Sequence, residues 1–243
     1  MEEINDGILK QIPINKSKNS IKVLDVGCGS GVLSEAIKNK GYIVWGIELN
    51  KETAQKAEKR IDRVINEDLL KFDEIKRIIG DDSFDYIIFS NVLEHLYDPF
   101  LALQNYLIFL KRGGLVLISV PNVAVWTNRI RLLFGKFDYY DTGTMDRTHI
   151  RFFTFKTAKL IVRESGCYIK KVDYTPFILR ALLPFIKKIM IGKKNTNQQN
   201  TRRIIDSPFY KLYLKFIYPI EYVSGYLFKT VFAYLIIIVG RKK

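Results

Sequence analysis

The chain has 243 residues with a formal net charge of +14, and 48% of its residues are hydrophobic. This length can bury one substantial core, and the lack of an uninterrupted apolar stretch of roughly 18 residues argues against a membrane-spanning helix. The acidic N-terminus lacks the pattern of a secretory signal, and the cysteines Cys28 and Cys167 offer no disulfide framework. We therefore expect a cytoplasmic protein.

The positive charge lies in the second half of the chain. Residues 1–120 carry 16 Lys/Arg and 18 Asp/Glu, whereas residues 121–243 carry 23 Lys/Arg and 7 Asp/Glu. A cationic region of this size favours an anionic partner, such as a phospholipid surface, a phosphate-bearing substrate or nucleic acid.

The first clear element is a short apolar run at residues 21–26, which predicts a buried parallel strand. Glycine follows at every second position, at Gly27, Gly29 and Gly31, and helix-forming residues come next. Glycines at such a turn let the backbone curl tightly and allow a ligand to approach the main chain. The spacing differs from the dinucleotide pattern G-x-G-x-x-G, because Val32 occupies the position of its third glycine.

Strands and helices then alternate along the chain, which predicts an α/β fold with a mostly parallel, doubly wound sheet. Glu48 falls at the end of the second strand, about 20 residues after the glycine turn, where an acid can accept hydrogen bonds from both ribose hydroxyls. Further strands are predicted at residues 42–49, 63–66, 84–90, 115–120 and 167–174, and helices at 2–11, 32–38, 51–61, 99–110 and 154–166.

Five blocks in this order resemble the class I S-adenosylmethionine-dependent methyltransferases. They are the glycine turn at 23–31, Glu48, Asp68, the strand-four segment 84–96 and the turn L-K-R-G-G at 110–114. The later segments 120–129 and 146–154 are similar to a bacterial type 11/23 branch of that family. The resemblance implies a Rossmann-like, seven-stranded sheet whose last strand, at residues 232–240, inserts antiparallel between strands five and six.

The resemblance also implies S-adenosylmethionine as the cofactor. Asp68 would receive the adenine amino group, and Asp25 would either reach the amino group of the cofactor or only brace the turn. The expected cofactor-binding residues are Asp25, Gly27, Cys28, Gly29, Gly31, Glu48, Leu49, Asp68, Leu69 and Asn91.

The two histidines of the chain, His95 and His149, are the candidate catalytic residues. Removing the proton of a hydroxyl acceptor calls for a general base, and either imidazole suits this task. Each histidine has a structural role as the alternative. His95 would only pack near the cofactor, and His149 would only hold its loop through a hydrogen bond.

The strand-four block bears on metal binding. Ubiquinone-pathway O-methyltransferases and small-RNA methyltransferases carry E-x-x-E-H there with a divalent cation, whereas this chain reads N-x-x-E-H, with Asn91 first. Losing a carboxylate weakens a site for a hard cation, so no metal is expected. A partial site from Glu94, His95 and His149 is the alternative.

Members of the type 11/23 branch often accompany cell-envelope polysaccharide or lipid biosynthesis. The resemblance therefore implies O-methylation of a glycan or a lipid-linked envelope intermediate. Arg129, Arg147 and Arg151 are the candidate substrate-binding residues, because the arginine fork suits phosphate or carboxylate groups. The alternative is that these arginines only form a basic surface exposed to solvent.

Residues 1–175 and 231–243 are expected to form the core, interrupted by an insertion at 176–230. This insertion holds 10 Lys/Arg, two acids and 10 Phe/Tyr, which favours amphipathic helices at the inner face of an anionic membrane. A helical cap or a dimer surface is the rival interpretation. Two other functions stay open. One is a membrane-docked accessory protein that binds the cofactor but is inactive. The other is an RNA methyltransferase, although nucleic-acid binding is not favoured because no RNA-binding module is recognisable.

Overall fold

The computed structural model describes residues 4–15, 20–80, 84–176, 215, 223 and 228–243. The chain divides into two compact units, one made of Met1–Val123, Asp138–Tyr174 and Leu235–Lys243, and the other of Ala124–Phe137 and Thr175–Tyr234. The predicted insertion at 176–230 lies almost entirely outside the described residues, so its helical, membrane-interfacial character stays a prediction.

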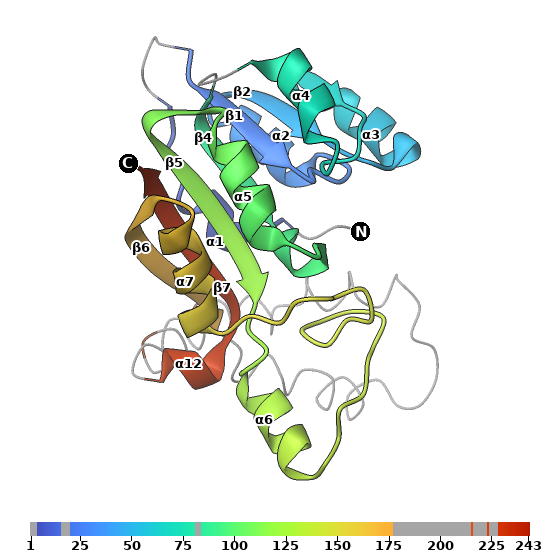
Figure 1. The fold of residues 1–243 in the computed structure, drawn as a ribbon, viewed down its shortest axis with the longest axis vertical. Helices are drawn as coiled ribbons and strands as arrows, with labels where there is room; N and C mark the ends of the chain where they lie inside the picture. Colours follow the sequence, from blue (N-terminus) through green and yellow to red (C-terminus); the bar gives the residue numbers. More distant parts are fainter. Residues whose placement is uncertain (1–3, 16–19, 81–83, 177–214, 216–222, 224–227) are drawn as a thin grey trace. The chain divides into compact units, whose positions relative to one another are not determined.

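A seven-stranded sheet forms the centre of the first unit (Figure 1). Its strands lie in the order β3-β2-β1-β4-β5-β7-β6. The first five in sequence pair in parallel, and β7 pairs antiparallel with β5. The predicted fold class and the place of the last strand between the fifth and the sixth are thus confirmed. The strands are β1 (Lys22–Val26), β2 (Ile43–Ile47), β3 (Arg63–Ile65), β4 (Phe84–Ser90), β5 (Leu110–Pro121), β6 (Cys167–Pro176) and β7 (Ala233–Lys242).

Helices cover both faces of this sheet. In the first unit α5 and α7 pack together on one face, and α1 packs against α2 on the other (Figure 1). The described helices are α1 (Asp6–Leu9), α2 (Val32–Lys38), α3 (Lys51–Glu58), α4 (Phe72–Ile79), α5 (Pro99–Leu107), α6 (Trp126–Leu133), α7 (Phe155–Glu164) and α12 (Lys229–Phe232), and a short 3₁₀ turn, η1, spans Leu93–His95. None of these helices is long and apolar enough to cross a membrane.

Several predicted boundaries were wrong. The helix predicted at 99–110 ends at Leu107, and the expected turn at 111–114 is part of β5. The reason is pairing: Leu110 lies opposite Phe84 on β4, and the register shift between Phe84 and Tyr86 takes up the extra residues. Helices α4 and α6 were not predicted.

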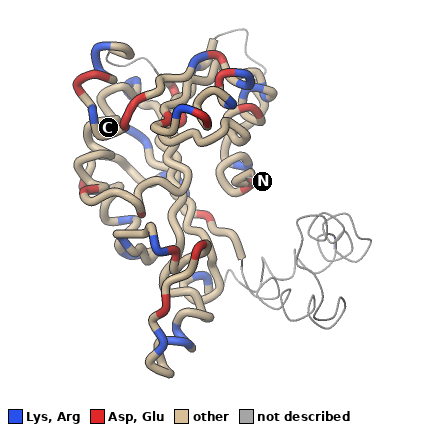
Figure 2. Tube along the Cα trace, turned by 90° about the vertical axis from the view of Figure 1, so that its right-hand side faces the viewer, with Lys and Arg blue, Asp and Glu red and all other residues tan. Residues whose placement is uncertain are grey.

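The central strands are buried on both faces, which is why their sequences read as continuous apolar runs. Val23, Leu24 and Val26 of β1 are fully buried, as are Ile87, Ile88 and Phe89 of β4. The carboxyl ends of these parallel strands meet at one edge of the sheet, where ligands of open α/β folds bind. Basic and acidic residues are interspersed along the described trace of this unit (Figure 2).

Candidate cofactor and catalytic site

The glycine turn after β1 adopts a backbone that other residues resist. Gly27, Gly29 and Gly31 have φ angles of 73°, 55° and 80°, in the left-handed region that favours glycine. A Cβ on Gly31 would lie 3.0 Å from the Cα of Ala57 in α3. The turn is also tied to β2, because the amides of Gly27 and Cys28 both donate to the carbonyl of Ile47. Strand, turn and neighbouring helix therefore fix one another.

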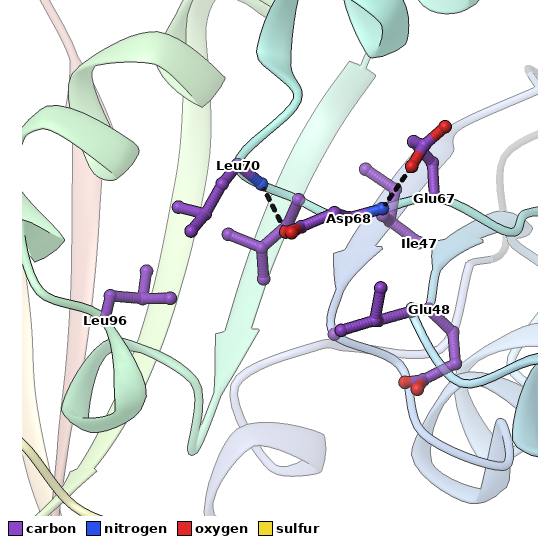
Figure 3. A pocket seen from close by; sticks show the side chains of 9 residues that line it. Ile47, Glu48, Glu67, Asp68, Leu70 and Leu96 are labelled. Carbon is purple, nitrogen blue, oxygen red and sulfur yellow. Dashed lines mark hydrogen bonds between the residues drawn. The ribbon is translucent and has the colours of Figure 1, made fainter.

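A cavity of about 270 Å³ opens beside this turn at the ends of β2 and β3. Leu96 faces it from the side opposite Glu48 (Figure 3). Its lining combines three carboxylates with an apolar surface, as suits a nucleoside that has both polar edges and flat faces. The lining residues are Gly27, Ile47, Glu48, Leu49, Glu67, Asp68, Leu69, Leu70 and Leu96.

Glu48 is held by backbone amides on both sides. Its Oε2 accepts from the amide of Gly29 at 3.0 Å, and its Oε1 accepts from the amide of Asn50 at 2.9 Å. An ionised carboxylate has about four acceptor positions, so each oxygen keeps one for a further donor. The acid at the tip of the second strand is thus oriented beside the glycine turn and the cavity.

Asp68 lines the cavity from a turn between Glu67 and Leu70 (Figure 3). Its Oδ1 accepts from the amide of Leu70, and its own amide donates to Glu67. The hydroxyl of Tyr106, from α5, donates to the carbonyl of Leu69 at 2.9 Å. These bonds fix the segment that carries Asp68.

Asp25 lies beneath the glycine turn and is 1% exposed. Its Oδ2 accepts from the hydroxyl of Ser34 in α2, whereas its Oδ1 has no hydrogen-bond partner in the described part of the chain. Burial raises the pKa of Asp25 to about 7, with the Ser34 bond opposing the rise and Glu48 adding to it. The hydrogen bond from Ser34 is the bracing contact that was one of the two expectations for Asp25. A contact between Asp25 and the cofactor stays a prediction.

Five expected cofactor residues are not among those that line the cavity, namely Asp25, Cys28, Gly29, Gly31 and Asn91. Cys28 is buried, and its side chain fills the space next to Gly46, where a Cβ would lie 2.5 Å from its Sγ. Asn91 has a φ of 56° and its Oδ1 accepts from the hydroxyl of Ser119 at 3.1 Å. Sequence reasoning missed Ile47, Glu67, Leu70 and Leu96, which line the cavity; each lies within one or two residues of a recognised strand end or motif.

His95 and His149 lie together although 54 positions separate them. Their ring centroids are 4.8 Å apart. The Nδ1 of His95 contacts the carbonyl of Thr148 at 3.2 Å, and that of His149 contacts the carbonyl of Thr144 at 3.4 Å. Burial and the neighbouring His95 lower the pKa of His149 below its usual 6.5. The structure thus brings the two candidate bases into one place.

Glu94, at the same turn, is 1% exposed, and neither carboxylate oxygen has a hydrogen-bond partner among the described residues. Burial raises its pKa to about 8. Donor atoms of Glu94, His95 and His149 lie within 4.8 Å of one another. We call these three residues the Glu94–His95–His149 cluster; its donors are those that bind divalent metals.

The three candidate substrate arginines make separate local contacts. Arg129 donates to the carbonyl of Ala124 within the second unit. Arg147 pairs with Asp141 at 2.6 Å. Arg151 donates to the carbonyl of Tyr97 and lies over the Tyr97 ring. Each has a local partner, and their role toward a substrate stays a prediction.

Comparison with known proteins agrees with this geometry. The model of the family Methyltransf_23, described as a methyltransferase domain, matches residues 2–172. The ubiquinone biosynthesis O-methyltransferase of Homo sapiens mitochondria is 28% identical over 185 residues, which cover 72% of this chain and 50% of that protein. The protein of the same name from Glaesserella parasuis is 35% identical over 118 residues, 45% of this chain and 50% of that one. The chain spans about half the length of the curated relatives it matches.

Solved structures share the fold. A SAM-dependent methyltransferase from Archaeoglobus fulgidus aligns with a TM-score of 0.61 and 21% identity, over 98% of this chain and 92% of that chain. Phosphoethanolamine N-methyltransferase 2 of Haemonchus contortus, crystallised with S-adenosyl-L-methionine, aligns with a TM-score of 0.57 and 19% identity, over 98% and 52%. With the family match over residues 2–172, the chain belongs to the Methyltransf_23 methyltransferase domain family, among the class I S-adenosylmethionine-dependent methyltransferases.

Proposed function

We propose that this chain transfers the methyl group of S-adenosylmethionine to a hydroxyl acceptor. The observation that carries the proposal is Glu48, a carboxylate oriented by two backbone amides at the mouth of a cavity beside a left-handed glycine turn. In the proposed complex, Glu48 accepts hydrogen bonds from the ribose hydroxyls of the cofactor. Asp68 accepts a hydrogen bond from the adenine amino group. The side chains of Leu70 and Leu96 supply apolar contact to the base.

Methyl transfer from a sulfonium is an in-line displacement in which the acceptor oxygen bonds to the methyl carbon while the carbon–sulfur bond breaks. It needs the reacting atoms about 3 Å apart and aligned, with water held away. The acceptor proton must leave as the new bond forms. We assign this role to His95 and His149, whose ring centroids lie 4.8 Å apart.

The cofactor site is tested by calorimetry with S-adenosylhomocysteine. Glu48→Ala removes a charged acceptor of two hydroxyls, and hydrogen bonds to charged groups contribute about 1.5–3 kcal/mol, so affinity should fall at least tenfold. Glu52→Ala, an exposed acid on α3, is the matched control and should bind as the wild type does. If Glu48→Ala and Glu52→Ala bound S-adenosylhomocysteine equally well, with unchanged thermal unfolding, the assignment of the cavity as the cofactor site would be wrong.

For the acceptor, we propose a glycan or lipid-linked envelope intermediate met at an anionic membrane. Support comes from residues 124–137, which hold three cations and no acid. The α6 end of this segment exposes large apolar side chains, Leu133 at 81% and Phe134 at 72%. Apolar residues beside cations suit the boundary between anionic headgroups and acyl chains. The curated relatives named above are O-methyltransferases, which fits an oxygen acceptor.

Vesicle flotation tests the membrane part. The full chain should float with phosphatidylglycerol vesicles and much less with phosphatidylcholine vesicles. Leu133→Asp/Phe134→Asp should reduce the floated fraction severalfold, while Leu101→Asp, an exposed leucine on α5, should not. A wild-type chain that stays at the bottom of the gradient with both lipids would refute it. The acceptor itself would be identified by comparing envelope glycans and lipids from cells with and without the gene.

A further inference from the structure

The glycine turn after β1 is held from the end of α3 as well as from β2. Arg60 follows α3, and its Nη1 donates to the carbonyl of Ser30 at 2.8 Å and to the Ser30 hydroxyl at 3.0 Å. Its Nε lies 3.5 Å from Oε2 of Glu35 in α2. Ser30 stands between Gly29 and Gly31. One partly buried guanidinium therefore connects the turn to both α2 and α3.

The peptide group between Ser30 and Gly31 is held at both of its polar atoms. The amide of Gly31 donates to the carbonyl of Cys28 at 3.0 Å, and the carbonyl of Ser30 accepts from Arg60. Glycine adopts left-handed and right-handed conformations about equally readily, so the glycines alone do not fix this turn. Contacts from outside the turn have to select its conformation, and Arg60 supplies two of them.

This section of the turn lies beyond the cavity proposed for the nucleoside. Gly27 is among the residues that line the cavity, whereas Gly29, Ser30 and Gly31 are not. With the nucleoside in the cavity, the amino-acid portion of the cofactor is the part that remains to meet the turn beyond Gly27. Glycine there allows a ligand to approach the main chain closely.

We propose that Arg60 is a positioning residue for S-adenosylmethionine, which holds residues 29–31 in the conformation that receives the amino-acid portion of the cofactor. This inference rests on the proposed cofactor site. Arg60 acts through Ser30, because it is not among the residues that line the cavity. Without Arg60 the turn populates other conformations, and the apparent affinity for the ligand falls in proportion to the fraction that is competent to bind.

Calorimetry on the full chain tests this role with two ligands. S-adenosylhomocysteine has the amino-acid portion, whereas 5′-methylthioadenosine has the nucleoside and the sulfur without it. Arg60→Ala should weaken binding of S-adenosylhomocysteine about tenfold, as expected for losing hydrogen bonds from a charged group, and change binding of 5′-methylthioadenosine less than about twofold. Arg60→Lys should restore part of the lost affinity, because lysine keeps the charge and can donate but lacks the planar fork.

Arg63→Ala is the matched control. Arg63 begins β3, and its guanidinium lies 4.4 Å from the centre of the Trp45 ring. This variant also loses an arginine that contacts another side chain, yet it should bind both ligands as the wild type does. In the ligand-free chain, hydrogen exchange of residues 28–31 should be faster in Arg60→Ala than in the wild type, with exchange of β1 and β4 unchanged.

Three results would each overturn the proposal: binding of both ligands by Arg60→Ala as by the wild type, equal weakening of both ligands, or faster exchange over the whole chain. Glu48→Ala, which should weaken both ligands, separates this proposal from the proposed function. Loss of affinity in Glu48→Ala with none in Arg60→Ala would remove only the role of Arg60. If Glu48→Ala bound both ligands as the wild type does, the proposed cofactor site would be wrong, and the role of Arg60 would fall with it.

Discussion

At the scale of single residues, the site depends on a few acids whose surroundings differ sharply. Glu48 is partly exposed and accepts hydrogen bonds from two backbone amides. Asp25, two residues before the first glycine, is buried, and one of its oxygens has no hydrogen-bond partner among the described residues. The first arrangement leaves an oriented carboxylate that can meet a ligand. The second favours a protonated acid, because burial penalises the charge.

This contrast predicts a pH dependence of stability. The pKa of Asp25 is raised to about 7 in the folded chain from an ordinary 3.8. Between about pH 4 and pH 7 the folded state therefore holds a proton that the unfolded state has released. The contribution of Asp25 is present at acidic pH and is lost as pH rises through this window, by at most about 1.4 kcal/mol per pH unit.

Urea unfolding at pH 4.5, 6 and 7.5, compared between the wild type and Asp25→Asn, measures this contribution. The amide cannot ionise, so the free energy of unfolding of the wild type should fall relative to that of the variant as pH rises. Parallel pH profiles of the two proteins would contradict the prediction. If the cationic amino group of the cofactor reaches Asp25, adding S-adenosylmethionine should move the window to lower pH, since an opposite charge favours the ionised form.

At the scale of elements, a four-residue helix is tied to the ends of two central strands. The Oδ1 of Asn5 accepts from the amide of Ile8 and caps α1. Its Nδ2 donates to the hydroxyls of Ser90, at the end of β4, and Ser119, in β5. Ser119 in turn donates to Asn91. One side chain thus connects the N-terminal helix to the edge of the sheet that carries the site.

Asn5→Ala should release α1. It removes two side-chain hydrogen bonds and a helix cap, each contributing about 1 kcal/mol, so we expect a loss of roughly 3 kcal/mol in stability. Hydrogen exchange of residues 5–12 should accelerate more than that of β1 and β4. Asn15→Ala, which removes a bond to the carbonyl of Gly41, is the milder control. Uniform acceleration over the whole chain would show that α1 has no separate tether.

The elements themselves were largely predictable, and the errors have physical causes. The glycine turn and the buried strands follow from local sequence, because only glycine accepts those φ angles and only apolar residues fill a strand covered on both faces. The end of α5 did not follow, since the pairing of Leu110 with Phe84 overrides the helix-forming character of residues 108–110. Helix α4 was missed although Phe72, Ile75 and Ile79 recur at helical spacing.

At the scale of the whole molecule, the two compact units of the chain differ in charge. Acidic and basic residues are interspersed along the described trace of the first unit (Figure 2), whereas residues 124–137 of the second unit hold three cations and no acid. Charge complementarity mainly sets association with a partner rather than the fold. Binding of the proposed acceptor therefore depends on the second unit, and binding of the cofactor depends on the first.

By itself the sequence determined the fold class, the glycine turn and the acid that ends the second strand, because these depend on neighbours along the chain. Only the tertiary structure decided that His95 meets His149 and that the carboxylate of Glu94 is buried with no hydrogen-bond partner among the described residues. Such contacts join residues about 50 positions apart, and loops rather than periodic elements place them. No local sequence pattern indicates which loop packs against which strand end. The distances between these residues therefore follow only from the folded chain.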